Sequence, residues 1–80
     1  MEIYKEDVYE IISNVLECEV NLIKQMNPDD DLAVCGMDSV SVIRLIVLLE
    51  ERYDIEFQED DIYIGKINTL NKIFELLKKY

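Results

Sequence analysis

Residues 36–57, GMDSVSVIRLIVLLEERYDIEF, decide how this chain folds. From Val40 to Leu49 the stretch is almost unbroken apolar sequence, and no proline or glycine interrupts it. On a helical wheel, the apolar positions separate into two groups. The wider group fits a protein core and comprises Val42, Leu45, Ile46, Leu49 and Tyr53. The narrower group comprises Val40, Ile43 and Val47. The stretch therefore predicts one helix over residues 39–53 with two apolar faces.

The narrower face has two interpretations. In the first, the long connection before the helix covers it, which is the common outcome in a helical bundle. In the second, the face is exposed, with acids such as Glu50 and Glu51 at its edge. An apolar centre with a charged edge is typical of a protein-docking surface. The solvent exposure of Val40, Ile43 and Val47 distinguishes the two interpretations.

Asp38 and Ser39 stand at the start of this helix, and either can cap it by accepting a hydrogen bond from an unpaired backbone N–H. If Asp38 is the cap, the Ser39 hydroxyl is free and points outward. A phosphate ester on that hydroxyl would lie at the positive end of the helix dipole, which favours an anion. The chain has no histidine, so any reaction of Ser39 needs a second protein to remove the proton.

The rest of the sequence predicts a small all-α domain. The predicted elements are helices over residues 4–18, 39–53 and 69–79, a short helix over 59–64 that Gly65 ends, and a long connection over 19–37. Apolar anchors are expected to pin the connection to the core at Val20, Leu22, Ile23, Leu32 and Val34. The predicted fold is a single domain over residues 1–80, a four-helix bundle of three longer helices and one short helix.

The chain has 18 acidic against 8 basic residues and a formal net charge of −10. This balance argues against nucleic acid and anionic membranes as partners, because both require clustered Lys and Arg. The natural complement is a basic patch on another protein.

No metal site and no catalytic residue are predicted. The acidic runs at residues 29–31 and 59–61 lack the spacing of a calcium loop and are expected to be solvated surface. Cys18 and Cys35 are too far apart in sequence for a zinc half-site. With no signal peptide and no apolar run of membrane-spanning length, the chain is expected to be cytoplasmic with reduced thiols.

Residues 31–57, DLAVCGMDSVSVIRLIVLLEERYDIEF, resemble the phosphopantetheine attachment region of acyl and peptidyl carrier proteins. That family's pattern is Gly, any residue, Asp and Ser, opening a helix that ends LxxLExx(F/Y)xIxF. The matching positions here are Gly36, Asp38, Ser39, Leu49, Glu50, Tyr53, Ile55 and Phe57. The resemblance extends over the whole chain, including its length, its acidity and its predicted helices.

The resemblance implies a non-catalytic carrier with an acyl-carrier-protein-like fold. A separate phosphopantetheinyl transferase, itself using magnesium, would move 4′-phosphopantetheine from coenzyme A to Ser39, and Asp38 would assist recognition. The thiol of that arm would hold acyl or aminoacyl groups as thioesters. A loading enzyme of adenylation or acyltransferase type and downstream synthase enzymes would dock on the monomer. The implied docking residues are Val40, Ile43, Val47, Glu50 and Glu51.

Three departures from the family pattern bear on partner choice and on the pathway. Cys35 replaces the usual Leu before the glycine, and Val40 follows the serine where Leu is commoner. Ser41 stands where carriers of fatty acid synthesis usually have Asp. The first two departures are expected to affect partner choice. Ser41, and the stretch SVIRLIVLLEERYDIEF over residues 41–57, which resembles stand-alone peptidyl-type carriers, favour a discrete carrier of a specialised pathway, of nonribosomal peptide or polyketide type. The alternatives are a fatty-acid-synthesis carrier, a D-alanyl carrier, and an unmodified acidic helical adaptor that only binds proteins.

Overall fold

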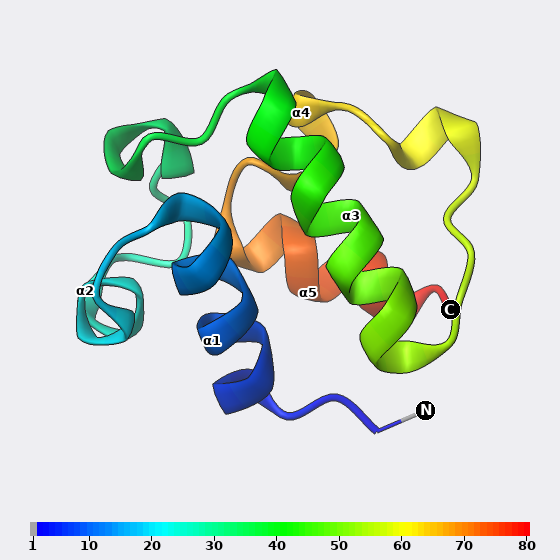
Figure 1. The fold of residues 1–80 in the computed structure, drawn as a ribbon, viewed down its shortest axis with the longest axis horizontal. Coiled ribbons are helices and arrows are strands. Elements are labelled where there is room, and N and C mark those ends of the chain that lie inside the picture. Colours follow the sequence, from blue (N-terminus) through cyan, green and yellow to red (C-terminus); the bar gives the residue numbers. More distant parts are fainter. Residues whose placement is uncertain (1) are drawn as a thin grey trace.

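A computed structural model describes residues 2–80, and this part of the chain is helical with no β-strand (Figure 1). The elements are α1 (Lys5–Leu16), α2 (Val20–Gln25), the 3₁₀ turn η1 (Leu32–Cys35), α3 (Ser39–Tyr53), the 3₁₀ turn η2 (Glu59–Asp61), α4 (Ile64–Ile67) and α5 (Leu70–Lys78). The predicted all-α class is confirmed, and α1, α3 and α5 are the three longer helices. Within residues 2–80, no helix is long and apolar enough to cross a membrane.

The core forms where the apolar faces of the three longer helices meet. Helix α1 packs on α3, and α4 packs on α5. In Figure 1, α3 passes diagonally across the molecule, with α1 to its left. The wider face of α3 is buried as predicted at Val42, Leu45, Ile46 and Leu49, while Tyr53 is partly buried. Spacing of i, i+3, i+4 and i+7 places these side chains on one face of the helix, and this face fixes the orientation of α3.

The predicted connection over residues 19–37 contains two elements that the sequence analysis missed, α2 and η1. Of its predicted anchors, Ile23 and Leu32 are buried and Val20 is half-buried. The predictions for Leu22 and Val34 are wrong, because both side chains are exposed. Adjacent positions on a helix point about 100° apart, so Leu22 faces away from the core when Ile23 faces it.

The predicted short helix over residues 59–64 is displaced along the chain. A 3₁₀ turn lies at Glu59–Asp61 and the helix lies at Ile64–Ile67, so Gly65 is inside the helix and does not end it. Ile67 supplies the buried anchor of this helix. The Asp61 side chain holds the earlier turn in place, since its Oδ2 accepts a hydrogen bond from the Tyr80 hydroxyl at 2.8 Å.

The acidic runs are not simply solvated surface. Asp61 is buried, contrary to the prediction, and its carboxylate contacts Lys79 Nζ at 3.2 Å. Asp29 accepts a hydrogen bond from the Asn71 side chain at 2.6 Å. Asp31 caps η1 by accepting from the Ala33 N–H at 2.9 Å, and it also accepts from the Asn68 side chain. These contacts tie the connection to the start of α5 and so fix the segment that leads into α3.

Candidate functional site

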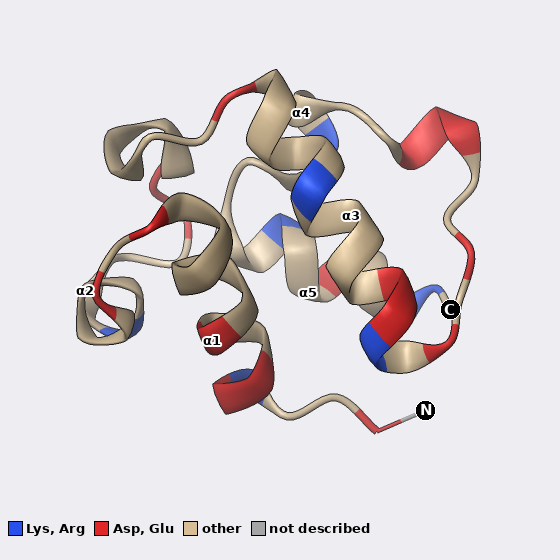
Figure 2. Cartoon of the chain, viewed as in Figure 1, with Lys and Arg blue, Asp and Glu red and all other residues tan. Residues whose placement is uncertain are grey.

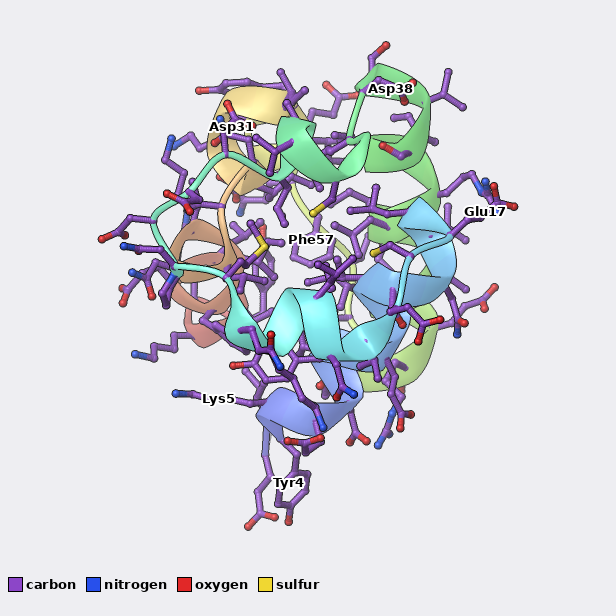
Figure 3. All side chains as sticks on the ribbon, turned by 90° about the vertical axis from the view of Figure 1, so that its left-hand side faces the viewer. Tyr4, Lys5, Glu17, Asp31, Asp38 and Phe57 are labelled. Carbon is purple, nitrogen blue, oxygen red and sulfur yellow. The ribbon has the colours of Figure 1, made fainter. Side chains whose placement is uncertain are left out.

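Asp38 and Ser41 close the N-terminus of α3 by reciprocal hydrogen bonds. Asp38 Oδ1 accepts from the Ser41 N–H at 2.9 Å, and Ser41 Oγ accepts from the Asp38 N–H at 2.8 Å. The hydrogen bond from the Ser41 backbone is the main reason that the pKa of the Asp38 carboxyl lies below its usual value. Of the two candidate caps, Asp38 is therefore the one that caps α3. Figure 3 shows Asp38 at the outer end of this helix.

Ser39 is exposed at the first position of α3 and takes no part in the cap. Among residues 2–80, its hydroxyl makes no hydrogen bond to another protein group, while the Ser41 hydroxyl is engaged. The chain is turned into this position by Gly36, whose φ of 95° is one that side-chain-bearing residues rarely adopt. After the turn, Met37 is buried and Ser39 points outward.

The narrower face of α3 is uncovered. The exposed fractions of Val40, Ile43 and Val47 are 67%, 54% and 45%. The structure therefore excludes the interpretation in which the preceding connection buries this face. Docking on it stays a prediction, because exposure alone identifies no partner.

A shallow open cavity of about 640 Å³ lies beside Ser39, between the start of α3 and the segment that enters α4. Its lining residues are Ser39, Val40, Val42, Ile43, Arg44, Ile62, Tyr63 and Ile64. Tyr63 and Ile64 are exposed apolar side chains that the sequence analysis did not assign to the site. The signal for them was an apolar pair directly before Gly65, which the sequence analysis instead placed at the end of a helix.

Glu50 was expected at the exposed acidic edge of the narrower face, but its side chain is engaged within the protein. The Glu50 side chain is half-buried, and its carboxylate accepts a hydrogen bond from the Phe57 N–H at 2.9 Å. Glu51 is exposed. The two acids lie about 17 and about 18 Å along the helix axis from Ser39, given the rise of about 1.5 Å per residue. Figure 2 shows the red segment at the C-terminal end of α3, with none in its first turns.

In the described part of the chain, no group beside Ser39 is placed to remove the proton of its hydroxyl. Asp38, the carboxylate next to Ser39, is held by the cap, and the chain has no histidine. Cys18 and Cys35 are free and half-buried, and burial raises the pKa of the Cys18 thiol. Within residues 2–80, no cluster of three or more His, Cys, Asp or Glu side chains could hold a metal ion. The arrangement presents an exposed hydroxyl, that of Ser39, at the start of α3.

Comparison with known proteins gives a consistent result. A family model described as the phosphopantetheine attachment site matches residues 6–77. The acyl carrier protein of Syntrophobacter fumaroxidans is 36% identical over 73 residues, which cover 90% of this chain and 84% of that protein. The acyl carrier protein of Buchnera aphidicola subsp. Schizaphis graminum is 30% identical over 73 residues, or 91% of this chain and 87% of that protein. No solved structure matches.

Proposed function

Because this chain belongs to the phosphopantetheine attachment family of acyl carrier proteins, we propose that Ser39 is the residue that bears its 4′-phosphopantetheine arm. The observation that supports this assignment is that the helix cap at the start of α3 uses two neighbouring residues and not Ser39. Asp38 and Ser41 satisfy the cap, which leaves the Ser39 hydroxyl exposed and unbonded within the described chain. A phosphate on this oxygen fits the site, since the unpaired N–H groups of the first helical turn favour an anion.

The modification requires a transferase. The Ser39 oxygen forms a bond to the phosphorus that bears pantetheine, the bond between that phosphorus and the rest of coenzyme A breaks, and 3′,5′-adenosine bisphosphate leaves. The proton of Ser39 passes to a base of the transferase, because Asp38 is engaged and the chain has no histidine. We assign to the exposed Asp38 a role in recognition by this magnesium-using enzyme. When bound, the arm supplies a thiol that holds an acyl or aminoacyl group as a thioester.

We infer that the chain is a non-catalytic carrier, a single monomeric domain over residues 1–80 that acts in the cytoplasm. Loading and downstream enzymes would dock on Val40, Ile43 and Val47, with Glu51 at the far end of α3. Glu50 contributes less than the sequence suggested, since its carboxylate is bonded to the Phe57 N–H.

For the pathway, we propose a specialised one of polyketide or nonribosomal peptide type, on the strength of Ser41 at the position after Val40. The hydroxyl of Ser41 serves the cap, so this departure from the usual Asp has a structural use. A fatty-acid-synthesis carrier is the second candidate, because the similar proteins are named acyl carrier proteins, which favours acyl over aminoacyl cargo.

The test is incubation of the chain with coenzyme A, Mg²⁺ and a broad-specificity transferase, followed by intact mass and peptide mapping. We expect the wild type to gain one 4′-phosphopantetheine, located on Ser39, and the Ser39→Ala variant to gain none. Ser13→Ala is the matched control and should be modified like the wild type. Modification that persists in Ser39→Ala would contradict the site. Absence of modification with several transferases would favour the unmodified adaptor.

A further inference from the structure

Arg44 is the single charged residue between Ser39 and Leu49, in a chain of net charge −10. Its side chain is exposed. Figure 2 shows a blue segment on α3 with tan segments before and after it. Side chains three or four positions away are its neighbours on the helix surface. These neighbours are Val40, Ser41, Val47 and Leu48, none of which is acidic.

Arg44 also lacks an acidic partner from other elements of the described chain. The salt bridges within residues 2–80 use Lys24, Arg52, Lys78 and Lys79, and not Arg44. Arg52 provides the contrast, because its guanidinium reaches Asp7 on α1 at 2.6 Å. Although the chain has 18 acids, none of those within residues 2–80 forms a salt bridge with Arg44.

The position of Arg44 connects it to the attachment site. It lines the same cavity as Ser39, together with the exposed apolar side chains of Val40, Ile43 and Tyr63. A protein that reaches the Ser39 hydroxyl and covers this apolar surface also removes water from the guanidinium. An uncompensated charge in such an interface is costly, whereas a carboxylate can pair with the guanidinium through two parallel hydrogen bonds.

We propose that the transferase that modifies this chain docks with an apolar surface against Val40 and Ile43 and a carboxylate against Arg44. This inference rests on the proposed function of Ser39. The net charge of the chain predicts a basic partner surface. Around Arg44, in the half of α3 nearer Ser39, we expect an acidic one instead. Basic groups of the partner would instead meet Glu51, so the contacts at Arg44 and Glu51 have opposite sign and fix the direction in which the enzyme binds along α3.

The test measures kcat/KM for modification by the phosphopantetheinyl transferase of the source organism, with coenzyme A and Mg²⁺. The variants are Arg44→Lys, Arg44→Gln and Arg44→Glu. We expect Arg44→Lys, which keeps the charge but loses the two parallel hydrogen bonds of the guanidinium, to lose about threefold in kcat/KM, and Arg44→Glu to lose about tenfold or more, mainly through a higher KM. Arg44→Gln should lie between them. The matched control is Lys78→Glu, which makes the same change in net charge on the exposed surface of α5 and should leave the rate within about twofold.

The direction in which kcat/KM changes in Arg44→Glu distinguishes an acidic enzyme surface from a basic one at this position. A faster reaction of Arg44→Glu would show that the enzyme surface is basic here and would overturn the inference. An equal loss in Arg44→Glu and Lys78→Glu would reduce the effect to net charge and would also overturn it. If Ser39 is modified and Arg44→Glu reacts like the wild type, the inference fails while the proposed function stands. If the wild type is modified by no transferase, both fail. Circular dichroism confirms that each variant is folded.

Discussion

Two substitutions on α3, Leu45→Ala and Ile43→Ala, test whether one apolar face of this helix is part of the core and the other is a free surface. Leu45 is fully buried, whereas Ile43 is 54% exposed. Truncating a buried leucine to alanine costs about 2–5 kcal/mol of unfolding free energy, since the lost transfer energy adds to a cavity. Full burial of an isoleucine contributes about 1.5–3 kcal/mol, so Ile43, a little under half buried, contributes at most about 0.7–1.4 kcal/mol. We expect Ile43→Ala to cost less than that, because alanine retains part of the contact.

The assay is urea unfolding followed by circular dichroism, with the thermal midpoint as a second measurement. One kcal/mol corresponds to a shift of about 4–8 °C in Tm for a domain of this size. Leu45→Ala should therefore lower the Tm by at least about 8 °C. The shift for Ile43→Ala should stay below about 3–11 °C and be smaller than the shift for Leu45→Ala. In the modification assay the order should reverse, with Ile43→Ala impaired although folded. Equal destabilisation by the two substitutions would refute the assignment of Ile43 to a free surface.

Two further predictions concern contacts that the sequence did not reveal. Chiefly the Tyr80 hydroxyl, and then Lys79, hold the pKa of the Asp61 carboxyl below its ordinary value. This contact therefore contributes stability above about pH 4, the usual pKa of an unfolded Asp, which is lost as the pH falls through the lowered folded pKa. We expect Tyr80→Phe to unfold more easily than wild type at pH 7, with the difference narrowing towards pH 2; a constant difference in Tm across this range would contradict the coupling. Glu50→Ala leaves the Phe57 N–H without its acceptor and should cost about 1 kcal/mol in urea unfolding. Glu51→Ala, the control on an exposed side chain, should stay within about 0.5 kcal/mol; equal effects would refute a structural role for Glu50.

The sequence predicted α3 best, because its apolar spacing continues over four turns without Gly or Pro. The helices α2 and α4 span six and four residues, which is too short for a 3.6-residue period to show. The N-terminal end of α3, where Ser39 lies, was also predictable, since capping is a local property. The choice between Asp38 and Ser39 as the cap depended on the side chain of Ser41, three residues along.

The contacts of the acids were not predictable from local pattern. Asp29 meets Asn71, 42 positions later, and Asp61 meets Tyr80, 19 positions later. Such pairs depend on how the helices pack, which no short stretch of sequence specifies. The same limit applies to the cavity beside Ser39, because it forms between α3 and a segment that begins some twenty residues further on.

The Asp38–Ser41 pair has a consequence for the working cycle of the carrier. Ser39 contributes nothing to the hydrogen bonds that terminate α3, so consuming its hydroxyl takes no support away from the helix. If Ser39 bears the arm as proposed, bare and modified forms would share one scaffold, and the arm would be added or removed without refolding. An enzyme that docks on α3 would then meet the same helix in every state of loading, and the attached group itself would distinguish the states.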